Sequence, residues 1–176
     1  MPKSVTRTVR LDEELDRALT KKASNGKTSV SFLVNRCIRK FVEWDSPSFE
    51  LGLVSVPETL LDKLARDKDE EALERFGREI ARDYVKPASE YVLGDFTVGS
   101  AVEILRRSSL YSGNFSFDFA SGHDSRNNVI VLRHDHGRPW SRYYAGLLDE
   151  TFRVLLGEEA KATYTDSLCV VQLKVH

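Results

Sequence analysis

The first 44 residues combine a short alternating stretch with two amphipathic helical patterns, and this combination most constrains how the chain can fold. The stretch SVTRTVRLDEEL occupies residues 4–15. Side chains alternate faces along an extended chain, so one face of this stretch is apolar, with Val5, Val9 and Leu11. The other face carries hydrogen-bonding groups and charge, with Thr6, Thr8 and Arg10.

Two helices are predicted after this stretch. Asp12 is suited to cap the first, over residues 13–23, and acidic residues follow in its first turn, where the helix dipole favours them. Thr28 or Ser29 then caps a second helix. Its apolar residues recur at intervals of three and four, which is the strongest periodic signal in the chain: Val30, Leu33, Val34, Cys37, Ile38, Phe41 and Val42.

A strand and two short helices of this size cannot form a stable domain alone. Roughly 45 residues bury too little apolar surface without a partner. A single exposed strand also leaves the hydrogen-bonding groups of its edges unpaired. Both problems disappear if two chains pair their strands antiparallel and interleave their helices.

Residues 1–46 therefore resemble the ribbon-helix-helix DNA-binding proteins of prokaryotes. The segments that carry the resemblance are TVRLDEEL, a turn, and TSVSFLVNRCIRKFV. The resemblance implies an intertwined homodimer in which the two strands form a ribbon that enters the major groove of double-stranded DNA. It also implies a role in transcription regulation, such as that of a repressor.

The resemblance further implies which residues contact DNA. The outward face of the ribbon would read base edges through Thr6, Thr8 and Arg10. A second group would hold phosphates, partly through backbone amides at the start of the second helix: Lys3, Arg7, Lys27, Ser29, Val30 and Ser31. Arg7 departs from the family pattern, because it occupies an inward position usually held by a branched apolar residue.

Charge is distributed unevenly along the chain. Residues 1–46 contain ten lysines and arginines against six acidic residues, whereas the remainder contains sixteen against twenty-one. A basic N-terminal segment beside an acidic body suits contact with a polyanion at one end, although ordinary solvated charge gives the same count.

The rest of the chain predicts a second, α+β domain over residues 51–176, with a mixed or antiparallel sheet covered by helices. The segment DSPSFELG after Trp44 reads as a linker. Strands are expected at 51–56, 114–121, 128–132, 160–165 and 168–175. Helices are expected from Pro57, over 70–85 with a stop before Pro87, from a capping box at 100–103, and over 140–156. The strand 128–132 is apolar on both faces and should lie centrally in the sheet.

Three histidines lie close together in the sequence of this second domain. His134 and His136 are two residues apart, so on a continuing strand they would face the same side, and His123 precedes them by eleven residues. The spacing is similar to that of the nickel-responsive ribbon-helix-helix repressors, which implies a transition metal held by these three side chains. Arg142 stands where the cysteine ligand of those repressors is expected.

Two other interpretations of the histidine segment remain open. It can be a polar loop between a strand and a helix. Alternatively, the histidines and Arg138 can hold a small anionic or polar ligand at the start of the following helix. Nearby aromatic residues would then line an apolar wall or belong to the core: Trp140, Tyr143 and Tyr144.

These patterns predict a homodimeric, sequence-specific DNA-binding regulator whose second domain senses a ligand or oligomerises. The alternatives are an antitoxin-like partner that regulates its own operon and a metal-responsive repressor. No nucleophile elbow, Gly-rich phosphate loop, CxxC pair or HExxH motif indicates an enzyme.

The sequence also bears on where the protein acts. No apolar run reaches the roughly 20 residues that a bilayer requires, and the N-terminal stretch lacks a signal-peptide core, so a cytoplasmic protein without a membrane partner is expected. Cys37 and Cys169 each lie in an apolar pattern, and both are expected to be reduced core residues.

Overall fold

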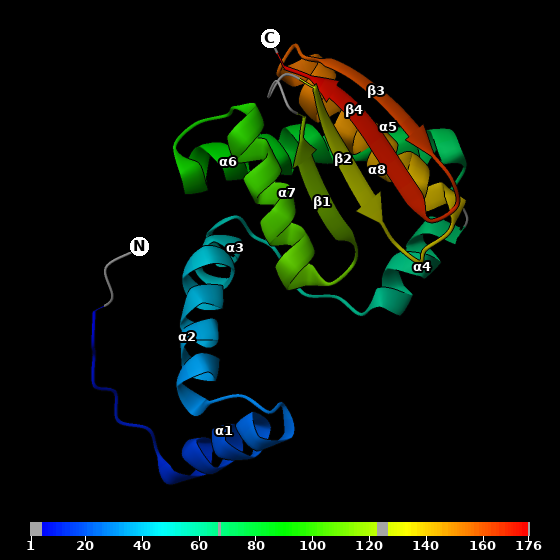
Figure 1. The fold of residues 1–176 in the computed structure, drawn as a ribbon. Helices are drawn as coiled ribbons and strands as arrows, with labels where there is room; N and C mark the ends of the chain where they lie inside the picture. The colour runs from blue at the N-terminus through cyan, green and yellow to red at the C-terminus, as the bar shows by residue number, and fades with distance from the viewer. Residues whose placement is uncertain (1–4, 67, 123–126, 176) are drawn as a thin grey trace. The chain divides into compact units, whose positions relative to one another are not determined.

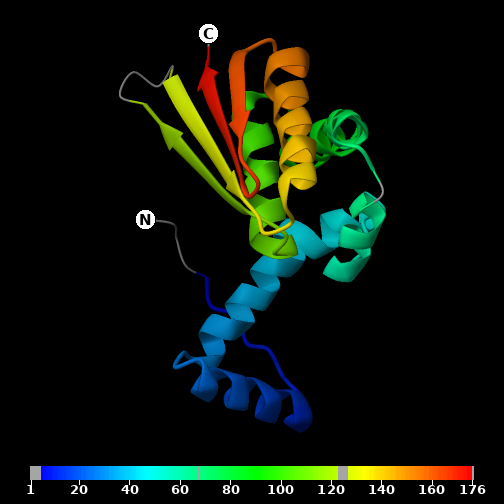
Figure 2. The same cartoon turned by 90° about the vertical axis from the view of Figure 1, so that its right-hand side faces the viewer.

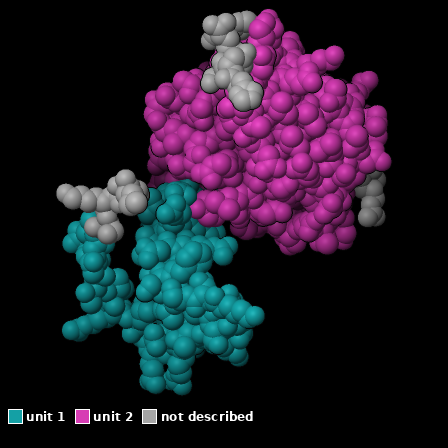
Figure 3. Space-filling model, viewed as in Figure 1, with its two compact units in different colours: residues 1–45 teal, residues 46–176 magenta. Residues whose placement is uncertain are grey.

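The computed structural model of the chain describes residues 5–66, 68–122 and 127–175. Contacts between Cα atoms divide the chain into two compact units, residues 1–45 and residues 46–176 (Figure 3). The strands of the described chain all belong to the second unit. The predictions that concern Lys3 and His123 lie outside the described residues.

The first unit contains two helices, α1 (Glu13–Asn25) and α2 (Val30–Lys40), and a π-helical turn over Phe41–Asp45. The predicted N-caps are confirmed. The Asp12 carboxylate accepts a hydrogen bond from the Leu15 amide at 2.8 Å, and the Ser29 hydroxyl accepts one from the Phe32 amide at 3.1 Å. Local sequence therefore fixes where both helices begin.

Residues 5–12 have no regular secondary structure in the described single chain, so the strand expected there is not formed. A lone strand has no partner for its backbone hydrogen bonds, which gives the physical reason. The ribbon-helix-helix fold is thus not shown by this structure, and the first unit is helical.

The second unit contains a four-stranded antiparallel sheet (Figure 1). The strands are β1 (Ser116–Ser121), β2 (Asn127–Arg133), β3 (Glu159–Tyr164) and β4 (Leu168–Lys174), in the order β1-β2-β4-β3. This confirms the α+β class, the antiparallel sheet and the central position of β2.

Helices cover one face of the sheet (Figure 2). The covering helices are α7 (Val98–Ser112) and α8 (Arg138–Asp149), and α8 continues into a π-helical turn over Glu150–Leu155. The core lies between these helices and the sheet, where Ile130, Leu132 and Phe152 are fully buried. No described helix of the second unit covers the opposite face, so within this unit the sheet is covered on one side only.

The remaining helices are α3 (Ser46–Glu50), α4 (Glu58–Arg66), α5 (Glu70–Ile80) and α6 (Lys86–Leu93). α3 lies within the predicted linker, so the expectation of an irregular segment there was wrong. The strand expected at 51–56 was also wrong, because residues 53–57 are irregular and Val54 is exposed. Its apolar pattern matches a strand, but no described strand pairs with it.

The helical path does not stop before Pro87, as the sequence predicted. α5 continues through a π-helical turn over Ala81–Val85 into α6. In this turn the Lys86 amide donates to the Ala81 carbonyl five residues earlier. The wider turn relieves the clash that a proline ring otherwise makes with the carbonyl four residues back, so the helix passes Pro87 unbroken.

α7 begins before the predicted capping box. Thr97 is its N-cap, and its hydroxyl accepts a hydrogen bond from the Ser100 amide at 3.2 Å. In return, the Ser100 hydroxyl accepts one from the Thr97 amide at 2.8 Å. Ser100 is therefore the third-position partner of a capping box rather than the cap itself.

The two cysteines differ in environment. Cys169 is buried in β4, as expected, and burial raises the pKa of its thiol to about 12. Cys37 is exposed on α2, so its expected place in a core is not found in the single chain. Among the described residues, no helix combines the length and apolar character that crossing a bilayer requires.

Candidate functional site

The predicted base-reading residues lie on the irregular segment before α1. Thr6, Thr8 and Arg10 are all exposed, as is the neighbouring Arg7. Neither arginine forms an ion pair with any residue that the structure describes. The guanidinium groups of this segment are therefore free to meet an external acceptor.

The predicted phosphate site lies at the start of α2. Ser29 caps the helix, and the amides of Val30 and Ser31 belong to its first turn, where helical geometry supplies no acceptor. Lys27 precedes the cap and is exposed, with a left-handed backbone at a φ of 48°. A helix N-terminus beside a lysine is a suitable environment for an anion.

The apolar faces of the first unit remain in solvent. Ala23 is its sole buried residue among those described. Val5 is 74% exposed and Phe41 is 60% exposed. The large apolar side chains exposed in this unit are Val5, Val9, Leu11, Leu15, Phe32, Ile38, Phe41 and Val42. Such a surface is typical of a segment that is folded against a partner.

In the second unit, His134 lies at the end of β2 and is buried. Its Nδ1 accepts a hydrogen bond from the His136 amide at 3.2 Å, so the ring proton resides on Nε2 and is donated to the Ser141 hydroxyl at 2.9 Å. Burial, together with the neighbouring His136, lowers the pKa of His134 to about 4. His134 is therefore neutral at pH 7, with both nitrogens engaged.

His136 joins three segments that are distant in the sequence. Its Nε2 faces the Asn114 carbonyl oxygen at 3.2 Å, and its Nδ1 faces the Asp62 carboxylate at 3.2 Å and that of Glu58 at 3.7 Å. A carbonyl and a carboxylate both accept hydrogen bonds, so each ring nitrogen of His136 faces an acceptor. His136 thereby connects α4 to the turn before β1.

Among the described residues, which do not include His123, this geometry does not assemble the predicted metal site. His134 and His136 stack with ring centroids 5.9 Å apart, but protein groups occupy all four of their nitrogens. Within the described ranges, no group of three or more histidine, cysteine, aspartate or glutamate side chains could hold a metal ion. The two described histidines support the fold of the β2–α8 connection.

Arg138 does not converge with the histidines either. Its guanidinium pairs with Glu70 at 3.2 Å and lies over the Tyr164 ring at 5.3 Å. Arg142, one turn later, pairs with Glu74 at 3.0 Å and lies over the same ring at 5.4 Å. The two arginines therefore attach α8 to α5 and β3 rather than form an anion site with the histidines.

The aromatic residues after the histidines belong to the packed interior. Tyr144 is buried beside His134, with ring centroids 5.0 Å apart, and Tyr143 packs edge-on against Trp140. Burial raises the pKa of both tyrosines. Trp140 also lines an apolar cavity of about 370 Å³ between α4 and α5. The aromatic wall is therefore mainly core, and no histidine is among the residues that line its cavity.

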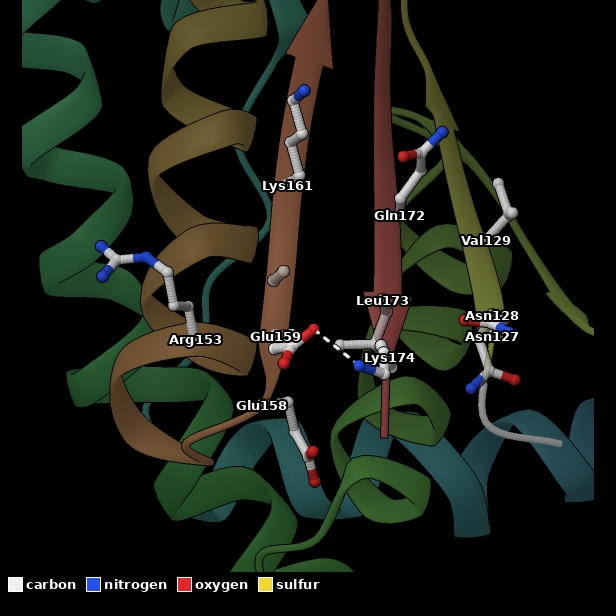
Figure 4. A pocket seen from close by; sticks show the side chains of 11 residues that line it. Asn127, Asn128, Val129, Arg153, Glu158, Glu159, Lys161, Gln172, Leu173 and Lys174 are labelled. Carbon is white, nitrogen blue, oxygen red and sulfur yellow. Dashed lines mark hydrogen bonds and ion pairs between the residues drawn. The ribbon is translucent and has the colours of Figure 1, made fainter. Parts of the chain in front are cut away.

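A more open cavity of about 690 Å³ lies at the end of the sheet that carries Asn127 and Lys174 (Figure 4). Lys161, Gln172 and Val129 form one row across three strands beside it. The Lys174 ammonium is already paired with Glu159 at 3.1 Å. The charges at this edge are thus largely neutralised within the chain.

Sequence reasoning missed the partners of the histidines. Ser141 lies seven residues from His134 and is fully buried, yet a serine in an amphipathic helix carries no distinctive signal. Asp62 lies 74 residues from His136. Only the helical phase of Ser141, which places it on the inward face of α8, could have indicated burial.

Comparison of the chain with models of known protein families, with curated protein sequences and with solved structures finds no match among them.

Proposed function

We propose that the protein is a homodimeric, sequence-specific DNA-binding regulator of the ribbon-helix-helix type. The observation that carries the proposal is the solvent-exposed apolar face of the first unit, which buries only Ala23 among its described residues. α1 and α2 are properly capped helices with one apolar side each, yet most of the large apolar side chains on these sides are not buried by any residue that the structure describes. A second copy supplies the missing half of the core.

Pairing of two copies also explains residues 5–12. Their alternating pattern suits a strand, and a two-fold partner offers the antiparallel neighbour that a single chain lacks. In the dimer, Val9 and Leu11 face the helices, whereas Thr8 and Arg10 face outward. The ribbon then carries its hydroxyl and guanidinium groups on the side available to DNA.

DNA recognition divides between the ribbon and α2. Arg10 donates two hydrogen bonds to guanine, and Thr8 contacts a neighbouring base edge. The first-turn amides of α2, together with Lys27 and Arg7, hold the backbone phosphates. Unpaired cations on this segment strengthen binding at low salt, because each phosphate contact releases counterions.

A binding assay tests the proposal. Selection from a randomised duplex library with the full-length protein should yield a preferred sequence with two related half-sites. On that duplex, Arg10→Ala and Thr8→Ala should each weaken binding by roughly 10-fold or more and relax the preference at one position. Arg17→Ala is the matched control, because Arg17 is an exposed α1 residue that pairs with Glu13 at 3.1 Å.

The control should retain affinity and specificity. Recovery of no preferred sequence, or equal specificity in the Arg10→Ala variant, would defeat the assignment of the ribbon as the reading element. The affinity of the wild-type protein should also fall steeply between about 50 and 200 mM salt.

A further inference from the structure

The sheet of the second unit presents one face that no described helix of the same unit covers (Figure 1). On this face, side chains from all four strands stand in rows set by the strand register. One row is Asp118, Val131, Val170 and Thr163. The next row is Ala120, Val129, Gln172 and Lys161. On the two central strands three of these four residues are valines and the fourth is Gln172, whereas the edge strands contribute Asp118, Thr163, Lys161 and the small Ala120.

The central strand β2 has the composition of a strand buried on both sides. Ile130 and Leu132 point into the core and are fully buried. Val129 and Val131 point the other way, and Val129 is 38% exposed. A strand with one solvated face usually alternates apolar and polar residues, whereas this one does not. The pattern indicates that a further layer covers the outer face.

The charges on this face lie at its rim as balanced pairs. Arg133 pairs with Asp118 at 2.7 Å at the β1 side, and Lys174 pairs with Glu159 at 3.1 Å at the β3 side. Lys161 is the remaining charge on β3. A face with both signs in near balance is unsuited to a polyanion such as nucleic acid. It suits a surface that carries the same two signs, such as another copy of itself.

The size of the face is sufficient for such a contact. Four strands about 4.8 Å apart and six residues of about 3.4 Å each span about 20 Å by 20 Å. Two copies would cover about 800 Å² in projection, and about 1,000 Å² or more once side-chain relief is included, which reaches the lower range of specific interfaces.

We propose that the uncovered face, centred on Val131 and Val170, is a self-association surface on which the sheet of a second copy of this chain packs face to face. The contact makes a four-layer arrangement with helices outside and two sheets inside. Two-fold symmetry brings the aliphatic centres of the two faces together and leaves the ion pairs at the rim. This surface contains no residue of α1 or α2.

The experiment measures the mass of the full-length protein by sedimentation in a background that removes pairing through the first unit. That background is Ile38→Asp/Phe41→Asp, which places charges on the exposed apolar side of α2. Three further substitutions are made separately in this background variant: Val131→Lys, the near-isosteric Val131→Thr, and the control Val154→Lys. Val154 is an exposed valine on the turn after α8, away from the sheet face.

The background variant should be dimeric at about 50 µM and dissociate on dilution. Val131→Lys should convert it to a monomer with an unchanged circular dichroism spectrum, whereas Val131→Thr and Val154→Lys should leave it dimeric. If Val131→Lys prevents folding, Val129→Lys at the more exposed neighbour repeats the test. The proposal is overturned if the background variant is monomeric. It is also overturned if the background protein stays dimeric after a lysine substitution that leaves it folded. DNA binding by the wild-type protein tests the first unit independently.

Discussion

Gly77 of α5 and Gly146 of α8 lie where these two helices pack, and each exposes bare backbone to the other helix. A Cβ atom on Gly77 would overlap the Tyr143 carbonyl oxygen, and one on Gly146 would overlap the Glu74 carbonyl oxygen. The obstructing atoms are backbone, so a side chain cannot rotate away to make room. The close approach of α5 to α8 therefore depends on glycine, which has no side chain, at both positions.

Substitution of either glycine by alanine should separate the helices and lower the free energy of unfolding. We expect Gly77→Ala and Gly146→Ala each to cost about 2–3 kcal/mol, measured by urea unfolding of the second unit. Gly99→Ala is the control, since a Cβ on this exposed α7 residue would meet only the Thr97 hydroxyl at 3.8 Å. That variant should be stabilised by about 0.5 kcal/mol. Equal effects at all three positions would contradict the helix-contact interpretation.

Acid should destabilise the second unit through His134. Its pKa is about 4 in the folded chain, and the ordinary value is 6.5. Below pH 6.5 the unfolded chain binds a proton that the folded chain excludes, so the free energy of unfolding should fall as the pH drops from 6.5 toward 4. Above pH 6.5 this contribution is constant. The groups facing the site are His136, Asp135, Asp62 and Glu58.

A His134→Gln variant isolates this effect. Glutamine has no titrating group and retains a donor for Ser141, so its unfolding free energy should change less across the same pH interval. The measurement is urea unfolding at a series of pH values. If wild type and variant show parallel pH profiles, His134 is not the group responsible.

The ion pair between Arg82 and Glu150 should matter more than the pairs on the surface. The Glu150 carboxylate is only 1% exposed and lies 2.7 Å from Arg82, which is half exposed. Arg82→Ala leaves a buried carboxylate without its cation and should cost about 1–3 kcal/mol. Arg106→Ala removes an exposed partner of Glu103, which retains Arg107, and should cost about 0.5 kcal/mol or less. Thermal unfolding of both variants measures the loss of stability that each substitution causes.

The first unit should lose structure on dilution while the second stays folded. Its helices expose apolar side chains, and in the proposed dimer a partner chain buries them, so their stability should depend on protein concentration. Amide hydrogen exchange of residues 13–45 should accelerate as the concentration falls from about 50 µM to below 1 µM. Exchange in the buried strand β2 should not change. Concentration-independent protection of α1 and α2 would contradict an obligate pairing.

Local signals in the sequence correctly predicted the starts of α1 and α2 and the four strands of the sheet. Asp12 and Ser29 cap α1 and α2 because a side-chain oxygen reaches an amide three residues later, which depends only on neighbouring residues. The strand alternation around Phe117 and the turn at Asp166 are likewise short-range features. Periods of 3.6 and 2 are properties of the local backbone and can be read directly.

The tertiary structure decided the contacts between distant residues, which the periodicity of the sequence does not specify. His136 was expected beside His134 as a ligand, but contacts with Asp62 and the Asn114 carbonyl direct its nitrogens elsewhere. The helix passes Pro87 because a π-helical turn forms before it, and α5 and α8 approach closely because neither Gly77 nor Gly146 carries a side chain. These outcomes depend on groups brought together from distant parts of the chain, and no local pattern encodes such distances. The sequence by itself determined most of the elements and their apolar faces, while packing determined which of those faces are buried and which remain exposed.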